Sequence, residues 1–137
     1  IAPYRKKPNL NGLTGRWAIQ WGKPGSITNA QALLAGSGQK FSGTVTLRHK
    51  MELQRWRRKD CDGQSHVEAT QHFSVVGDVD EAKVRVTYSH DKYTDCSCSE
   101  TVCRATAAVV DMPGGTFYMN LDGTVLMKQG VLMSKLP

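Results

Sequence analysis

The sequence predicts an all-β domain, an antiparallel up-and-down meander of about six to eight strands, for which we favour a barrel over a sandwich. Apolar and polar residues alternate along most of the chain after Phe41, which is the period of a half-buried strand. Turn signals made of Asp, Gly and Pro separate the alternating stretches, and a single segment has helical character. Strands of this kind bury one face only if their sheet closes on itself or packs on another sheet.

The N-terminal part of the chain predicts an arm, a strand and a connection. Residues 1–12 are polar and basic, so we expect an N-terminal arm before a single domain over residues 13–137. Residues 16–21 (RWAIQW) predict a short aromatic strand. Residues 22–38 are rich in Gly, Pro and Ser and predict a connection, within which residues 28–35 (TNAQALLA) predict about two turns of helix.

A long hairpin is predicted next. Both of its strands alternate, and their inward residues are Phe41, Val45, Leu47, Met51, Leu53, Val67, Ala69, Phe73 and Val75. A turn of three residues at positions 62–64 (DGQ) keeps core residues opposite core residues across the hairpin. In this register Leu53 lies opposite Phe73, and Met51 lies opposite Val75.

The C-terminal half of the chain predicts further strands of the same meander. They cover residues 83–94, 103–112, 116–121 and 124–136. The turn signals between them are Asp80-Glu81, Pro113-Gly114-Gly115 and Asp122-Gly123. The meander brings the segment after residue 94 back to the end of the domain that carries the turn at positions 62–64.

The cysteines predict a disulfide staple at that end. The chain has four of them, Cys61, Cys96, Cys98 and Cys103. A bridge between Cys96 and Cys98 would close a very tight ring, so we expect Cys61 to pair with Cys96 or Cys98, and Cys103 with the other. A zinc site and free thiols are the alternatives, although the spacing lacks a Cys-x-x-Cys pair. Two bridges predict an oxidising compartment and a secreted or periplasmic protein.

Two short stretches carry a resemblance to a known group of folds. Leu13-Thr14-Gly15-Arg16-Trp17, with Gly22 five positions after the tryptophan, precedes Phe41-Ser42-Gly43-Thr44. This pattern resembles the first two strands of the calycin barrels (the lipocalin and avidin group), and within them the avidin branch. The resemblance covers about thirty residues and implies an up-and-down barrel in which Trp17 closes one end.

The resemblance does not extend to a ligand. Avidin-like proteins have a biotin-binding Asn and a Tyr at the positions that Ile19 and Val45 hold in this sequence. Lipocalins stack a C-terminal Arg on the first-strand Trp, whereas no Arg follows Arg104 and either Lys128 or Lys135 would have to take that place. We therefore expect the barrel from the resemblance, and no biotin site.

Charge predicts one contact surface. The formal net charge is +6, which favours anionic partners. The predicted hairpin tip carries Arg48, Lys50, Arg55, Trp56, Arg57, Arg58 and Lys59. Alternation places Arg48, Lys50, Trp56 and Arg58 on the outward face. Arginine and tryptophan together suit phosphate, sulfate or membrane surfaces, so we expect a binding protein whose partner is an anionic polymer, a membrane surface or another protein. A solvated strand end that discourages aggregation is the alternative interpretation.

Two other functions are open. A small-molecule carrier would use the barrel interior, lined by Trp17, Phe73, Tyr88 or Tyr118. An inhibitor of a secreted hydrolase would insert either the connection at residues 22–38 or the basic arm at residues 1–8 into the partner's cleft. No stretch approaches the roughly 18 apolar residues of a membrane-spanning helix, and we expect no transmembrane segment.

Catalytic and metal motifs are not found in the sequence. Neighbouring residues of a strand point to opposite faces, so Ser89-His90-Asp91 cannot form a catalytic relay. His66 and His72 are about 20 Å apart along one predicted strand and cannot hold one ion together. We favour a protein that is not an enzyme, with no cofactor and no metal. Spatially converging carboxylates such as Asp111 and Asp122 leave catalysis without a motif open.

Overall fold

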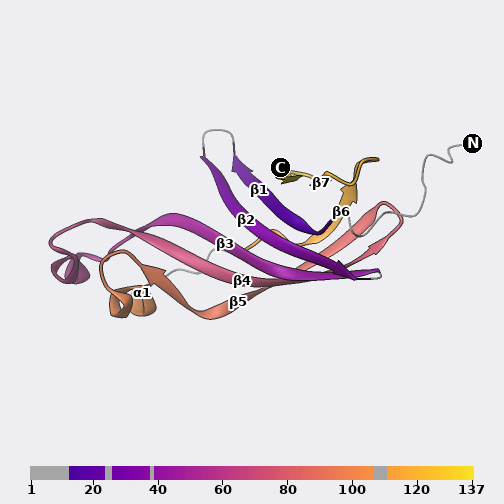
Figure 1. Cartoon of the computed structure of the whole chain (residues 1–137). Coiled ribbons are helices and arrows are strands. Elements are labelled where there is room, and N and C mark those ends of the chain that lie inside the picture. Colours follow the sequence, from indigo (N-terminus) through magenta and orange to yellow (C-terminus); the bar gives the residue numbers. More distant parts are fainter. Residues whose placement is uncertain (1–12, 24–25, 38, 107–110) are drawn as a thin grey trace, which may run out of the picture.

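The computed structural model describes residues 13–23, 26–37, 39–106 and 111–137. Within them, eight antiparallel strands form a closed barrel in which each strand pairs with its neighbour in sequence and β8 pairs with β1 (Figure 1). The strands are β1 (Gly15–Lys23), β2 (Ser26–Ser37), β3 (Lys40–Glu52), β4 (His66–Asp80), β5 (Lys83–Cys96), β6 (Gly115–Met119), β7 (Val125–Lys128) and β8 (Val131–Lys135). The predicted all-β meander is confirmed, and its closure is that of a barrel.

Three neighbouring strands, β3, β4 and β5, are the longest of the barrel, and β2 follows with 12 residues. β3, β4 and β5 have 13, 15 and 14 residues, whereas β6, β7 and β8 have 4 or 5 each. They therefore run past the barrel, and Figure 1 shows their far ends standing apart from the β1–β2 hairpin. This extension carries a 3-10 helix, η2 (Arg55–Cys61), and a short helix, α1 (Glu100–Thr106).

Two apolar cores follow from this shape. Inward residues of all eight strands fill the barrel, and Trp17 lies fully buried with its Nε1 donating to the carbonyl oxygen of Leu13 at 2.8 Å. A second, smaller core lies under η2 and α1 and consists of Met51, Leu53, Cys61, Val67, Ala69, Val102 and Cys103. Gln71 and Thr94 are buried and directly opposite each other between the two cores. The extension is therefore a packed unit of its own on the end of the barrel.

The second strand of the barrel corrects one prediction. Residues 28–35, expected to be helical, belong to β2, which pairs with β1 on one side and β3 on the other. Ala30, Ala32 and Leu34 point inward with a period of two, and the two flanking strands satisfy the backbone. These gains outweigh the weak helical preference of Ala and Leu. Residues 26–37 are thus a strand and do not provide the inhibitory loop expected at residues 22–38.

The hairpin register is also corrected. Met51 lies opposite Val67, and Val45 lies opposite Phe73. The strand ends at Glu52 because the next residues wind into η2, so the connection is much longer than three residues. The register moves by an even number of residues, which keeps every predicted inward side chain inward while changing its cross-strand partner.

The C-terminal half holds two more differences. The strand predicted at residues 103–112 is not formed: residues 103–106 belong to α1, residues 107–110 lie outside the described part, and residues 111–112 are outside any strand. The strand predicted at residues 124–136 is two strands, β7 and β8, joined by a tight turn in which Gly130 has a φ of 77°. The strands expected at residues 16–21, 83–94 and 116–121 are found within or overlapping β1, β5 and β6.

Candidate functional site

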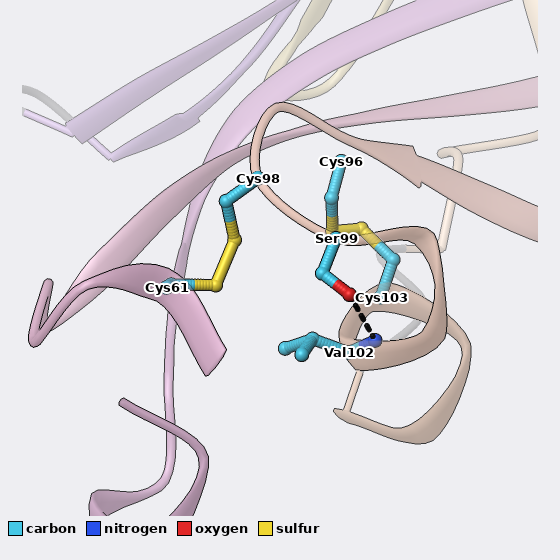
Figure 2. The surroundings of a disulfide bond; sticks show 6 residues. All are labelled: Cys61, Cys96, Cys98, Ser99, Val102 and Cys103. Carbon is cyan, nitrogen blue, oxygen red and sulfur yellow. Dashed lines mark hydrogen bonds between the residues drawn. A yellow bond between two sulfur atoms is a disulfide. The ribbon is translucent and has the colours of Figure 1, made fainter. Parts of the chain in front are cut away.

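Two disulfides hold the end of the extension together (Figure 2). Cys61, the last residue of η2, is bonded to Cys98, and their Cα atoms are 5.6 Å apart. Cys96, the last residue of β5, is bonded to Cys103 of α1 with a Cα separation of 5.5 Å. This pairing is one of the two expected, and all four cysteines lie at the predicted end. They are therefore bridged and not zinc ligands, which indicates an oxidising environment outside the cytoplasm.

Helix α1 begins beside these bridges for a local reason. Ser99 precedes it, and the Ser99 Oγ accepts a hydrogen bond from the backbone N–H of Val102 at 3.4 Å (Figure 2). Glu100 occupies the first turn and Arg104 the last, which suits the helix dipole, and the two side chains form an ion pair. The apolar-polar alternation from residue 103, which predicted a strand, does not show that Ser99 caps a helix at this position.

The connection that contains η2 is closed by backbone hydrogen bonds. The N–H of Leu53 donates to the carbonyl of Ser65 at 2.8 Å and joins the two ends of the connection. The N–H of Gly63 donates to the carbonyl of Arg58 at 2.7 Å, and Asp62 turns the chain with a φ of 54°. With the Cys61 bridge, these contacts fix η2 on the end of the extension.

Trp56 is an exposed aromatic side chain of the extension, with 65% of its surface accessible. Its Nε1 donates to the side-chain oxygen of Gln54 at 2.6 Å. The Arg57 guanidinium carbon lies 4.2 Å from the centroid of the indole ring. The indole is therefore held in a defined orientation, with one cation against its π system and a large apolar surface in contact with solvent.

Four cations lie on the same 3-10 helix as this indole. We define the basic tip as the run from Arg55 to Lys59 of η2, which carries Arg55, Arg57, Arg58 and Lys59. The ion pairs within the described part of the chain join His72 to Asp95, Arg85 to Asp78 and Arg104 to Glu100, and none of these pairs includes a residue of the tip. Positive charge on the basic tip is therefore not neutralised by a contacting carboxylate of any described residue.

The helical form of η2 corrects the predicted faces of the tip. Residues 55–59 wind around a 3-10 helix and do not alternate between two strand faces. Arg57 and Arg58 are half-buried, each with its Nε atom out of contact with solvent, whereas Arg55, Trp56 and Lys59 are exposed. Lys50 and Arg48 stay on the outward face of β3, as predicted, but outside the tip. Lys50 lies opposite Glu68, and Arg48 lines a groove on the barrel wall.

The predicted interior residues lie in different places. Trp17 and Phe73 are buried in the barrel core, and Tyr88 is half-buried beside it. Tyr118 is 56% exposed on the outer face of β6, so its predicted place in the interior is wrong. Alternation along β6 explains the error, since Phe117 and Met119 take the inward positions.

A hollow of about 420 Å³ opens beside Tyr88. It lies where β5 leaves β6, because the pairing of these strands ends at Val86 and Gly115. The residues around it are Phe73, Val86, Thr87, Tyr88, His90, Asp111, Met112, Gly114 and Gly115. The sequence did not predict His90 and Met112 for this site. The β5–β6 pairing stops at Val86, and this is what leaves Met112 beside the part of β5 that follows Val86.

Side chains at this hollow are mostly neutral. The His90 ring packs edge-on against Phe73 with the centroids 5.0 Å apart, and its Nε2 shares a hydrogen bond of 3.1 Å with the Gln71 amide. Burial raises the pKa of the Tyr88 phenol above its ordinary value, and the hydroxyl donates to the Met133 sulfur at 3.9 Å. The hollow therefore joins apolar walls to a few uncharged polar groups and to the carboxyl group of Asp111.

The described residues contain no cluster of three or more His, Cys, Asp or Glu side chains that could hold a metal ion. Among the same residues, no helix is long and apolar enough to cross a bilayer. Comparison with known protein families, with curated proteins and with solved structures found no match. We therefore infer the function from the geometry of the tip, the hollow and the barrel wall.

Proposed function

We propose that this chain is a secreted or periplasmic binding protein with a calycin-like barrel, and that its basic tip contacts an anionic polymer. Support for the fold group comes from the closed eight-stranded meander and from Trp17, which is fully buried near the first residues of β1. Support for the compartment comes from the two disulfides. Support for the partner comes from the residues of the basic tip.

The stack of Arg57 on Trp56 is the observation that carries the proposal. An exposed indole of this size has a solvation cost, and the Gln54 hydrogen bond keeps it in the exposed position. The stacked guanidinium keeps donors available to an oxyanion beside the ring. Such a pair can contact a sulfate or phosphate group and the apolar face of the adjoining unit at the same time.

A polymer suits the tip better than a single small anion. The four cations are distributed over one and a half to two turns of a helix and do not converge on a pocket. Each exposed contact contributes little by itself, and a repeating anionic chain would add several such contacts. A membrane surface and an acidic protein are the competing partners for the same residues.

Retention on immobilised heparin tests the tip. Replacing Arg57→Ala together with Arg58→Ala removes two tip cations, and we expect about tenfold weaker binding and elution at lower salt. The control variant, Lys83→Ala with Arg85→Ala, removes the same charge at the opposite end of β5. Its elution should move much less than that of the tip variant.

Two results would oppose the proposal. If the tip variant and the control variant elute together, retention reflects net charge and not the tip. If heparin is not bound but anionic phospholipid vesicles are, with loss in the tip variant, the partner is a membrane surface.

A small-molecule carrier is the second candidate, because the hollow beside Tyr88 has the volume and mixed lining of ligand sites. Titration with the neutral fluorescent probe N-phenylnaphthylamine should give saturable binding. Replacing Met112→Trp fills the hollow and should abolish this binding, whereas Met127→Trp, at a residue that is 55% exposed, should not. Equal binding by both variants would place the probe elsewhere and remove the carrier hypothesis.

A further inference from the structure

A second hollow lies on the outer wall of the barrel, away from both the tip and Tyr88. It has a volume of about 690 Å³ and crosses β1, β2 and β3. Outward-facing residues of these three strands line it, among them Arg16, Ala18, Gln31, Leu33, Thr46 and Arg48. We call this hollow the wall groove.

The register of β1, β2 and β3 arranges the residues of the groove in cross-strand rows. Ala18, Gln31 and Thr46 form the middle row, because Ala18 pairs with Gln31 and Gln31 pairs with Thr46. The small side chains at both ends of this row leave space above the sheet. Arg16, in the row on one side, pairs with Leu33.

Two arginines stand at opposite corners of the groove. Arg16 of β1 and Thr44 of β3 lie in the same cross-strand row, one on each side of β2. Arg48 follows Thr44 by four residues along β3. Strand spacing and rise place the Cα atoms of Arg16 and Arg48 about 17 Å apart. Both side chains are exposed, and neither forms an ion pair with another residue of the described part. They can therefore bind two separate anionic groups of one extended ligand.

The groove between the arginines is lined by neutral hydrogen-bonding groups. Asn29 and Gln31 offer amides, and Thr44 and Thr46 offer hydroxyls. Among the described residues, its lining includes no carboxylate, which would repel an anion, and no aromatic ring on which a nucleobase could stack. Leu33 is the one large apolar side chain among the described residues of the lining, which is too little for an acyl chain.

We infer that the wall groove binds a short stretch of acidic saccharide. Arg16 and Arg48 each take one carboxylate or sulfate group, and the amides and hydroxyls between them bond the sugar hydroxyls. This site shares no residue with the basic tip and does not depend on the proposed function of the tip. An acidic polysaccharide would nevertheless fit both surfaces, so the two inferences name compatible partners.

Calorimetric titration with a chondroitin sulfate hexasaccharide tests the inference. Arg16→Gln and Arg48→Gln should each weaken binding about tenfold, as expected for the loss of one charge-assisted contact. Gln31→Ala should weaken it about threefold. Arg85→Gln serves as the matched control, because this exposed arginine lies on β5 outside the groove, and its affinity should stay within about twofold of the parent.

A second arm separates the saccharide chemistry from charge alone. A hyaluronan hexasaccharide, which carries carboxylates but no sulfates, distinguishes the anionic group that the arginines prefer. Single-stranded DNA of equal charge should bind more weakly than the saccharides and should be insensitive to Gln31→Ala. Amide resonances of Gln31 and Thr46 should shift with the saccharide.

Failure of this inference is distinct from failure of the tip proposal. If Arg16→Gln and Arg48→Gln bind the hexasaccharide like the parent while Arg57→Ala with Arg58→Ala does not, the groove is not the site and the tip is. If the groove variants lose binding and the tip variant keeps it, the groove inference holds by itself. Equal affinity for DNA, with the same losses in every variant, would show a site that reads charge only and would overturn the saccharide assignment.

Discussion

Tyr88 connects the barrel core to the hollow beside β5. Its side chain is half-buried against the core, and its hydroxyl faces the Met133 sulfur. Burial disfavours the charged phenolate, so the pKa in the folded protein lies above the ordinary 10.0. The folded state therefore keeps the Tyr88 proton at a pH where the unfolded chain has begun to release it.

Stability should consequently fall as the pH rises above about 10, the ordinary pKa of the residue. Below that pH both states bind the proton, and the contribution of Tyr88 is fully present. Urea unfolding at a series of pH values from neutral to strongly alkaline measures the slope. Tyr88→Phe should flatten it, whereas Tyr118→Phe, a change at an exposed tyrosine, should leave it as in the parent. Identical slopes in all three proteins would show that Tyr88 titrates freely in the folded state.

At the residue scale, alternation predicted which side chains are buried better than it predicted which side chains they contact. Met51, Leu53 and Phe73 are buried as expected, because the side chains of a strand take opposite faces whatever the partner strand is. Tyr118 was misplaced because its neighbours Phe117 and Met119 compete for the same inward face. A choice between aromatic residues in one short strand depends on register, which composition does not specify.

The two disulfides close loops of very different length. Cys61–Cys98 closes a sequence separation of 37 residues, and Cys96–Cys103 closes one of 7. In the chain-entropy account, constraint of the unfolded chain contributes about 4 kcal/mol for the longer loop and about 2 kcal/mol for the shorter. The longer bridge also fixes η2, which carries the basic tip.

Removing the bridges one at a time should show this difference. Cys61→Ala with Cys98→Ala is expected to reduce the free energy of unfolding more than Cys96→Ala with Cys103→Ala, as measured by urea unfolding. Each pair removes one buried cysteine, Cys61 or Cys103, so the cavity terms are comparable. Heparin affinity should fall mainly in the first pair. A larger loss of stability in the second pair would contradict the loop-length account.

At the element scale, sequence reasoning predicted strands well and short helices poorly. β5 and β6 follow from alternation and turn residues, but η2 and α1 do not. Residues 55–59 read as a strand end because four cations and one indole have no period that distinguishes a 3-10 helix. Residues 28–35 read as a helix because the propensities of Ala and Leu were given more weight than two neighbouring strands, which only the fold supplies.

The whole molecule separates its candidate sites over one scaffold. The tip stands at the end of the three-strand extension, whereas the wall groove lies on the outer face of β1, β2 and β3. The tip was visible in the sequence as a basic run, because its cations are contiguous. The groove was not, because Arg16, Gln31 and Arg48 come together only through the pairing of three strands.

Mapping the surface that meets an anionic polymer is the most direct test of the central claim about the tip. Backbone amide shifts of labelled protein should be recorded during titration with heparin. We expect the largest changes in residues 55–61, together with a shift of the Trp56 indole N–H, and small changes at Lys83 and Arg85. Changes confined to the turn between β4 and β5, with residues 55–61 unperturbed, would contradict the assignment of the basic tip as the contact surface.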